Sequence, residues 1–428
     1  MIKLLDSKQK NFDTILNKLL SKRKDKIQLK SGLVTKIIKD VKKNGDKSIL
    51  KYEKKFNKNI IITPSLKQIK KSISSLDKKV KKAIDLAYNR IYNFHSLQKF
   101  KNISFTDKLQ NKLDYKYIPI ESVAIYVPGS SVSYPSSVLM NAIPALVAGI
   151  KRIVMINPGY QGKQNPAVLY AAKKCKIKEI YSIGGPSAIA GVAYGTKKIK
   201  KVDKIVGPGN LYVAAAKKEV FGDVGIEGMI AGPSEVTIVC DKFSNPKWVA
   251  SDLVAQAEHD NLAQCILISK DKKVIKEVNT EIIKQLNELP RATTARNSIL
   301  TNGILIYTAS EKKIIDIVNK IAPEHLELNI KNYKNMVKKI VNAGAIFLGK
   351  YSTEAVGDYL AGTNHVLPTS GSSKFSSGLS VYDFYKRISY INLSKKGIET
   401  LGPSVITLAN FEGLTGHAKS VELRIRRK

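Results

Sequence analysis

From Ile118 onward, short apolar runs rich in Val and Ile alternate with helical patterns, and this alternation limits the possible folds more than any other feature. The clear runs are Val123–Val127, Ile153–Ile156, Ile180–Ile183, Ile205–Val206, Val236–Val239, Cys265–Ile268 and Ile304–Tyr307, with Ala345–Leu348 as a further candidate. Strands that alternate with helices form βαβ units and largely parallel sheets. The sequence therefore predicts an α/β fold, preceded over residues 1 to about 100 by basic helices.

The size and charge of the chain say less about its function. A chain of 428 residues buries a large core and divides into two or more domains. Its net charge of +37 suggests nucleic-acid binding, but only nine of its 72 basic residues are arginine, the residue that phosphate and base recognition favours. The lysines are also spread along the chain, so we expect solvated surfaces and no nucleic-acid partner.

Membrane insertion and secretion are not expected either. The best apolar stretch, Val138–Ile150, is short for a membrane span and is interrupted by Asn141 and Pro144. The first residues lack the continuous apolar stretch of a signal peptide. Three widely spaced cysteines in apolar segments predict buried, reduced thiols in a cytoplasmic protein.

Glycine-rich turns accompany several of the predicted strands. In parallel sheets, ligands bind beyond the carboxyl ends of the strands, and glycine lets backbone N–H groups approach a phosphate. The turns that we place there are Pro128–Ser131, Gly184–Ser187, Gly207–Asn210 and Ala231–Ser234. The Gly-x-Gly-x-x-Gly fingerprint is missing, because Tyr212 occupies the third position after Gly207 and Gly209. Spacing alone therefore supports a nucleotide site and ordinary tight turns about equally.

Four of the five histidines lie in the last 170 residues, each near a carboxylate, an amide or a glycine-rich loop. They are His259, His325, His365 and His417. Imidazole is the commonest metal ligand among side chains and the only one that titrates near neutrality when unperturbed. We therefore predict a metal-dependent enzyme with one site gathered by folding.

Two short motifs could build such a site. Gln256 and His259 lie three residues apart at the end of a predicted helix, Trp248–Ala257, so both side chains share one helix face and form half of a metal site. Glu324 and His325 are adjacent, and in a turn both can face one cleft and act separately in proton transfer. The respective alternatives are a polar surface helix end and an ordinary capped turn.

The stretch Gly349–Asp383 is rich in Gly, Ser and Thr and includes Asp358, Asn364 and His365. Loops of this length are usually functional or disordered. Interleaved apolar residues such as Val366 argue against disorder, so we predict a binding loop.

Together these residues resemble the histidinol dehydrogenase family. The matching stretches run in order from about residue 120 to the C-terminus, and the helical N-terminal region is compatible. They are Tyr126–Gly129, Tyr134–Asn141, Gly207–Asn210, Ala231–Val236, Ala255–Asp260, Pro323–His325, Gly362–Gly371, Phe375–Val381 and Leu414–Ser420.

The resemblance implies an activity, two cofactors and a set of site residues. Members oxidise L-histidinol to L-histidine through the aldehyde, in the last steps of histidine biosynthesis, and pass two hydrides to two NAD. The implied Zn2+ ligands, which also contact substrate, are Gln256, His259, Asp358 and His417. Glu324 would activate water, and His325 would be the general base. The other implied substrate contacts are Ser234, His365 and Glu412, and the implied NAD contacts are Tyr126, Ser187 and Asn210.

The resemblance also implies a domain layout and an oligomeric state. The implied fold has two incomplete Rossmann-like domains. One is formed by residues 21–124 and 236–379 and carries the zinc site, and the other is formed by residues 125–235 and binds NAD. A helical segment, residues 1–20, and a C-terminal segment, residues 380–428, complete the chain. The family is a homodimer in which the C-terminal segment reaches the partner's site, so Glu412 and His417 would act in trans.

Two positions depart from the family pattern. Ser187 stands where the family usually has a glutamine that contacts NAD, and Ser130–Val132 replaces a loop richer in glycine and alanine. A shorter Ser187 side chain could contact NAD through water, so we expect weaker cofactor binding than is typical.

Three functional hypotheses follow. The first is a zinc- and NAD-dependent histidinol dehydrogenase, and the second is a relative that oxidises another small alcohol. The presence of Glu412, His417 and His365, the contacts on the imidazole side of the substrate, favours the first. The third, a basic nucleic-acid-binding protein, predicts salt-dependent binding that is indifferent to His259→Ala.

Overall fold

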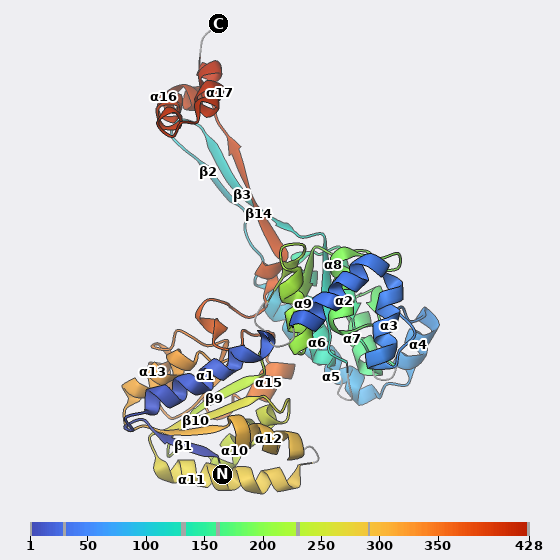
Figure 1. The fold of residues 1–428 in the computed structure, drawn as a ribbon. Coiled ribbons are helices and arrows are strands. Elements are labelled where there is room, and N and C mark those ends of the chain that lie inside the picture. The colour runs from blue at the N-terminus through green and yellow to red at the C-terminus, as the bar shows by residue number, and fades with distance from the viewer. Residues whose placement is uncertain are drawn as a thin grey trace. The chain divides into compact units, whose positions relative to one another are not determined.

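The apolar runs form two parallel sheets in the computed structural model, which describes residues 2–28, 31–129, 134–159, 163–227, 232–289 and 292–425. The chain divides into two units. One comprises Met1–Gln98 and Glu121–Asp383 and contains both parallel sheets, and the other comprises Lys99–Ile120 and Phe384–Lys428. Figure 1 shows the succession of helices and strands in each unit.

The first parallel sheet has five strands in the order β6-β5-β4-β7-β8. Its strands are β4 (Ser122–Tyr126), β5 (Arg152–Ile156), β6 (Glu179–Tyr181), β7 (Lys204–Val206) and β8 (Gly225–Ile226). Its helices are α2 (Ser31–Asn44), α3 (Asp46–Asn57), α4 (Leu66–Ser74), α5 (Lys78–Ser96), α6 (Pro135–Ala148), α7 (Pro166–Lys174), α8 (Gly185–Tyr194) and α9 (Leu211–Val220). Apolar residues of α2, α3, α8 and α9 share one buried core with the strands, so these helices cover one face of the sheet.

The second parallel sheet has six strands in the order β1-β11-β10-β9-β12-β13. They are β1 (Lys3–Asp6), β9 (Glu235–Cys240), β10 (Gln264–Ser269), β11 (Ile304–Tyr307), β12 (His325–Asn329) and β13 (Ala345–Leu348). One face packs on α10 (Pro246–Ala257), α11 (Lys272–Glu288) and α12 (Ala292–Asn302). The other packs on α1 (Phe12–Gln28), α13 (Glu311–Ile321) and α14 (Tyr333–Val337). After β13 the chain forms a short helix, α15 (Glu354–Tyr359), and two 3-10 turns, Ser372–Lys374 and Val381–Phe384.

The second unit is built on an antiparallel sheet in the order β14-β3-β2. Its elements are β2 (Ile103–Thr106), β3 (Lys112–Pro119), β14 (Tyr385–Asn392), α16 (Lys395–Phe411) and α17 (Thr415–Ile425). The long pair β3 and β14 is in register from Lys112 opposite Asn392 to Pro119 opposite Tyr385. The turn before α16 is fixed by Asn111, whose side chain accepts a hydrogen bond from Ser394 N at 3.0 Å.

The predicted α/β class with two parallel sheets is confirmed. All eight predicted apolar runs are strands, and the predicted helix Trp248–Ala257 is α10, which begins where Pro246 follows the N-cap Asn245. Two local predictions were wrong. The N-terminus begins with strand β1, which pairs with β11, and His325 begins strand β12 rather than lying in a turn.

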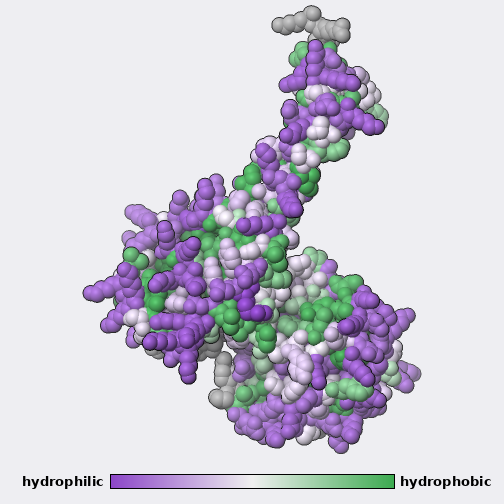
Figure 2. Space-filling view, turned by 180° about the vertical axis from the view of Figure 1, so that it is seen from behind, coloured by the Kyte–Doolittle hydropathy of each residue, from purple (hydrophilic) through white to green (hydrophobic). Residues whose placement is uncertain are grey.

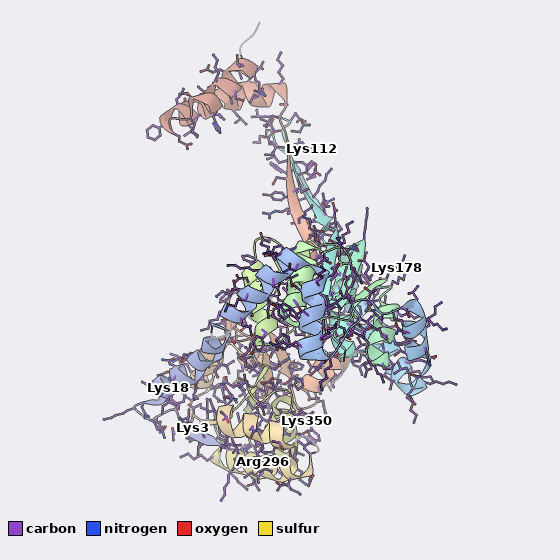
Figure 3. All side chains as sticks on the ribbon, turned by 45° about the vertical axis from the view of Figure 1, so that its right-hand side comes forward. Lys3, Lys18, Lys112, Lys178, Arg296 and Lys350 are labelled. Atoms are coloured by element: carbon purple, nitrogen blue, oxygen red, sulfur yellow. The ribbon has the colours of Figure 1, made fainter. Side chains whose placement is uncertain are left out.

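The predicted domain boundaries stay a prediction. Helices α2 and α3, whose residues the sequence grouped with 236–379, pack against the sheet that contains β4–β8. Among the described helices, none combines the length and apolar character that a bilayer crossing needs. The basic side chains are distributed over both units, as the labelled examples Lys18, Lys112 and Lys350 show (Figure 3).

Candidate active site

The Glu324-His325 pair lies at the amino end of β12, which lies between β9 and the edge strand β13 of the second parallel sheet. Helix α13 ends at Ile321, and Ala322 adopts a left-handed conformation with φ of 48°. This turn, followed by Pro323, leads the chain directly into the buried strand. Both side chains are nearly inaccessible, with 6% of Glu324 and 4% of His325 exposed. Burying an ionisable group costs free energy unless the group has a partner, so the contacts of these two side chains determine their chemistry.

His325 is held in a single tautomer by the neighbouring strand. Its Nδ1 lies 3.0 Å from the backbone oxygen of Glu235, the first residue of β9. A carbonyl oxygen only accepts, so Nδ1 carries the proton and donates it, which leaves a lone pair on Nε2. Within the described residues, Nε2 is buried and has no hydrogen-bond partner. Burial lowers the pKa of His325 to about 3, so the ring is neutral and Nε2 is free to accept a proton.

Glu324 is oriented by the same residue of β9. Its Oε2 accepts a hydrogen bond from the backbone N–H of Glu235 at 2.9 Å. Burial raises the pKa of Glu324 well above its usual range, and the carboxyl groups of Glu235 and Asp358 raise it further, whereas the Glu235 N–H opposes this shift. A raised pKa makes the ionised carboxylate a stronger proton acceptor, which is the property a water-activating base needs.

The predicted metal ligands of the first unit meet around His325. Gln256 lies in the last turn of α10 and is completely buried, and His259 is exposed just beyond the end of that helix. Asp358 of α15 places Oδ1 at 3.9 Å from Nε2 of His325 and at 3.8 Å from Nδ1 of His365. His259 is also close enough to contribute to lowering the pKa values of His325 and His365, after the larger effect of burial.

His365 has a fixed tautomer as well. Its Nδ1 lies 3.0 Å from the backbone oxygen of Asp358, to which it can only donate. Burial lowers its pKa to about 4, so Nε2 carries a lone pair at neutral pH. Ser234, the remaining substrate-contact candidate of this unit, is half-buried at the start of β9, and its backbone oxygen accepts from Gln264 N at 3.0 Å.

The donor set suits a divalent cation. Ligand atoms of His325, Glu354 and Asp358 lie within 4.8 Å of one another. Burial raises the pKa of Asp358 to about 7 and the pKa of Glu354 well above its usual range. In the described part of the chain, no lysine or arginine forms an ion pair with either carboxylate. A cation would supply the missing positive charge beside these buried carboxyl groups, so these residues fit a Zn2+ site.

A second group of candidates lies at the carboxyl end of the first sheet. Its strand order places β4 between strands reached in opposite directions along the chain, which is the switch point where parallel sheets bind nucleotides. Tyr126 ends β4, and Gly207–Asn210 follows the neighbouring β7. Gly207 has φ of 102°, and a Cβ there would lie 2.3 Å from the Tyr126 backbone oxygen, so only glycine fits.

The side chains of the three predicted NAD contacts differ in their exposure and in their hydrogen bonds. Asn210 is exposed and caps α9, with Oδ1 accepting from Tyr212 N and Val213 N at 3.1 Å, which leaves its Nδ2 to donate. The Tyr126 hydroxyl is buried and accepts from Gly185 N at 3.1 Å. Ser187 is also buried and donates its hydroxyl to Gly184 O at 3.1 Å, so its side chain stabilises the turn.

Two of the predicted loops lie partly or wholly outside the residues that the structure describes. Ser130–Val132 lies entirely outside them, as does Ala231. We placed Ala231–Ser234 beyond the carboxyl end of a strand, and this was wrong, because Gly232–Ser234 leads into the amino end of β9. There the backbone N–H of Gly232 donates to Thr369 Oγ1 at 2.6 Å, which joins this segment to the predicted binding loop.

The last two predicted site residues belong to the second unit. Glu412 ends α16, and His417 lies in the first turn of α17. Both are solvent-exposed in the single chain. They can therefore contact another protein surface without rearrangement of their own helices.

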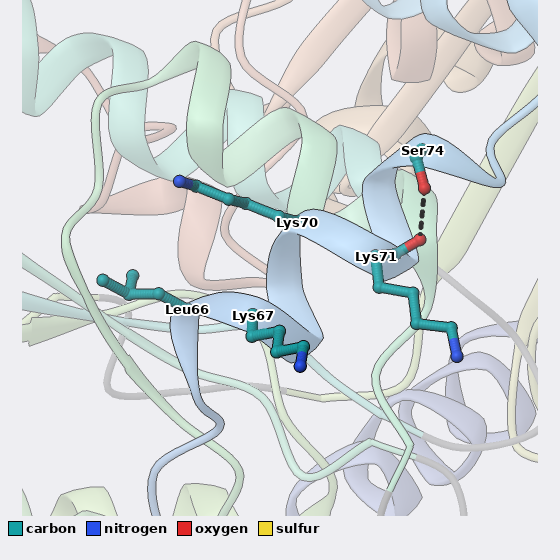
Figure 4. Close-up of a pocket in the computed structure, with 5 residues that line it drawn as sticks. All are labelled: Leu66, Lys67, Lys70, Lys71 and Ser74. Carbon is teal, nitrogen blue, oxygen red and sulfur yellow. Dashed lines mark hydrogen bonds between the residues drawn. The ribbon is translucent and has the colours of Figure 1, made fainter.

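A surface depression on α4 is separate from these groups. Its lining residues are Leu66, Lys67, Lys70, Lys71 and Ser74, which all belong to this one helix. Figure 4 shows the lysine side chains extending away from one another. Because every lining residue belongs to this one helix, the depression is a groove along a helix surface and not part of the site.

One buried residue of the site escaped the sequence analysis. Glu354, at the start of α15, lies against both Gln256 and His325, and its Oε1 is 3.8 Å from Nδ1 of His325. The stretch Gly349–Asp383 around it was predicted to be a binding loop, but within this stretch only Asp358 and His365 were predicted to be site residues. Nothing in the local sequence distinguishes Glu354 from a surface acid.

Comparison with known proteins identifies the family of the chain. The sequence signature of histidinol dehydrogenase matches residues 20–425. The histidinol dehydrogenase of Pelagibacter ubique strain HTCC1062 is 80% identical over 428 residues, which covers 100% of both chains. Histidinol dehydrogenase 1 of Trichormus variabilis is 44% identical over 99% of this chain and 98% of its own length.

A solved structure shows the same fold. The crystal structure of histidinol dehydrogenase from Elizabethkingia anophelis superposes with a TM-score of 0.92 at 37% identity, covering 99% of this chain and 98% of that one. The buried acid–histidine pair, the sheet order and these relatives lead to one conclusion. The chain belongs to the histidinol dehydrogenase family, which are oxidoreductases of histidine biosynthesis.

Proposed function

We propose that this chain oxidises L-histidinol to L-histidine through L-histidinaldehyde, with one Zn2+ per subunit and two NAD per turnover. The observation that carries the proposal is the state of His325. This buried ring is neutral, has its proton fixed on Nδ1, and turns towards Asp358 an Nε2 that has no hydrogen-bond partner among the described residues. That is the arrangement of a general base beside a metal site.

The Zn2+ ligands would be Gln256, His259 and Asp358 of one subunit, together with His417 of the partner subunit. Bound Zn2+ would hold an imidazole nitrogen and the amino group of the substrate and so fix the position of its carbinol carbon. Ser234, His365 and Glu412 would complete the substrate site. The position of His365 supports this role, because its neutral Nε2 can accept a hydrogen bond from a substrate N–H.

Proton transfer is divided between two residues. His325 would accept the hydroxyl proton during the first oxidation, with the imidazolium stabilised by its bond to Glu235 O. Glu324 would then remove a proton from water as the water adds to the aldehyde, since the Glu235 N–H fixes the orientation of its carboxylate. Two bases suit this reaction, because one proton is removed from the substrate hydroxyl and another is removed later from water.

NAD would bind at the carboxyl end of the first sheet and accept the hydride in each oxidation. The switch point between β4 and β7 supports this placement, together with the glycine-rich turn at Gly207 and the exposed side chain of Asn210. Tyr126 and Ser187 would contribute mainly by shaping the turn at the start of α8.

The second unit supports a homodimer in which Glu412 and His417 act in the partner's site. It exposes large apolar side chains, with Phe411 91%, Ile391 72% and Leu408 63% accessible. Figure 2 shows such apolar surface on this unit between hydrophilic side chains. Exposed apolar residues in this number favour burial against another copy.

A cytoplasmic location is also part of the proposal. The three cysteines, Cys175, Cys240 and Cys265, are free and buried. Unpaired thiols are typical of a reducing compartment.

The test is the yield of NADH per L-histidinol consumed, followed by absorbance with and without a chelator. We expect about two NADH per substrate, loss of the reaction with the chelator and recovery with Zn2+. A folded, zinc-loaded protein that produces no NADH from histidinol would contradict the proposal and favour a different alcohol substrate.

A further inference from the structure

The carboxamide of Gln256 can serve as a metal ligand in only one orientation. Its oxygen can bind a cation, whereas its NH2 group is a donor and cannot. Gln256 is completely buried, so its neighbours decide which end faces the site. In the orientation that satisfies both groups, Nε2 faces Glu354 and donates to both of its carboxyl oxygens, to Oε2 at 2.8 Å. This contact turns the NH2 group towards Glu354 and leaves Oε1 for a ligand.

Glu354 is itself fixed by two other acidic residues. Its backbone N–H donates to Oε1 of Glu327 in β12 at 2.8 Å. The preceding residue, Thr353, donates its hydroxyl to Oδ1 of Asp252 in α10 at 2.9 Å. The side chains of Asp252 and Glu327 are hydrogen-bonded to one another, which joins these two contacts. The start of α15 is therefore attached to both α10 and β12.

We propose that Glu354 is a positioning residue of the metal site, which acts by orienting Gln256. Because Gln256 belongs to α10 and Asp358 to α15, the same contact also sets the spacing between two of the ligands. The inference rests on the proposed function, since it requires Gln256 to bind the metal. It explains why an acid with no assigned role is buried in this site, with 4% of its surface exposed.

The main alternative is that Glu354 is a ligand in its own right. Its carboxylate lies close enough to His325 and Asp358 to contact the same cation. The two possibilities differ in their dependence on Gln256. A positioning residue loses its effect when Gln256 is removed, whereas a direct ligand keeps it.

The experiment is a double-mutant cycle on Zn2+ affinity, measured by competition with a chromophoric chelator. The variants are Glu354→Gln, Gln256→Ala and the double mutant. Glu354→Gln keeps the size of the side chain but adds an NH2 group that can donate to Gln256 Oε1. We expect it to weaken Zn2+ binding by about 10- to 100-fold, as is usual for residues that orient metal ligands. In the Gln256→Ala background the same substitution should have little further effect.

Additive losses in the two backgrounds would overturn the proposal in favour of a direct ligand, and unchanged affinity in Glu354→Gln would overturn it outright. The matched control is Glu53→Gln, an equally buried acid with 1% exposure that contacts Gly184 at the start of α8, and it should leave Zn2+ affinity unchanged.

Thermal unfolding of each metal-free variant separates loss of orientation from loss of fold. Metal-free Glu354→Gln should unfold close to wild type, and a large decrease would indicate a purely structural residue. If the wild-type chain itself bound no Zn2+, the proposed function would fail. If wild type bound Zn2+ and Glu354→Gln bound it equally well, only this inference would fail.

Discussion

At the scale of single residues, the site depends on which atom carries a proton or faces a ligand. His325 can act as a base because the Glu235 carbonyl accepts its Nδ1–H and leaves Nε2 without a partner in the described chain. The sequence identified His325, Gln256 and Asp358, since their side-chain chemistry is recognisable and matches a family pattern. It did not identify Glu354, because its contact with Gln256 joins residues far apart along the chain.

The first prediction concerns His325→Ala. Removal of the general base should lower kcat by about 10²- to 10⁴-fold, the usual contribution of acid–base catalysis. Zinc content, measured by atomic absorption on the purified protein, should stay near one per subunit, because the proposed ligands are other residues. Loss of the metal together with activity would instead identify His325 as a ligand.

At the scale of elements, buried polar contacts connect helices to the turns that form the sites. Glu53 of α3 accepts hydrogen bonds from Gly184 N and from Asn57 Nδ2, both at 2.8 Å, and so attaches α3 to the start of α8. Burial raises its pKa to about 7 despite these hydrogen bonds. The sequence predicted α3 as a basic helix but could not show that one of its acids faces inward.

We therefore predict that Glu53 makes stability depend on pH. Its pKa is higher in the folded state than its ordinary value of 4.5, so its contribution is complete below that value and is lost as the pH rises through 7. Between pH 5 and 8 the free energy of unfolding should fall by roughly 2 to 3 kcal/mol more in wild type than in Glu53→Gln. Urea unfolding of both proteins at several pH values measures the difference, and parallel pH profiles would show that Glu53 does not titrate in this range.

Element boundaries show a similar limit of sequence analysis. The strands with continuous Val and Ile were all predicted, because buried parallel strands are apolar on both faces. Strand β12 was missed because its sequence, His325–Asn329, contains polar residues that are nonetheless buried. Their partners are distant in sequence, as with Glu327, which accepts from the backbone of Glu354.

At the scale of the whole molecule, the two parallel sheets repeat one topology but use opposite ends. The order β6-β5-β4-β7-β8 recurs in β11-β10-β9-β12-β13, with β1 added at the edge. In the first sheet the cofactor candidates lie at the carboxyl ends, whereas the acid–histidine pair of the second lies at the amino end of β12. At the carboxyl end of the second sheet, Ser244 donates its hydroxyl to Asn329 O and joins the segments that follow β9 and β12.

The prediction at this scale tests whether sites are shared between subunits. His417→Ala and His325→Ala proteins should each be inactive, but after equal amounts are unfolded and refolded together, about a quarter of the wild-type activity should return. Half of the random dimers would be mixed, and each of these would contain one site with both histidines intact. Refolding each variant alone is the control, and absence of any recovery in the mixture would indicate sites built within one chain.

The sequence by itself determined the α/β class, the positions of the apolar strands and the residue types able to bind a metal or move a proton. These follow from local periodicity and side-chain chemistry, which are properties of neighbouring residues. Only the tertiary structure decided that His325 begins a strand, that its proton is on Nδ1 and that Glu354 faces Gln256. Each depends on a contact between distant segments, and burial then converts that contact into a tautomer, a pKa or an orientation.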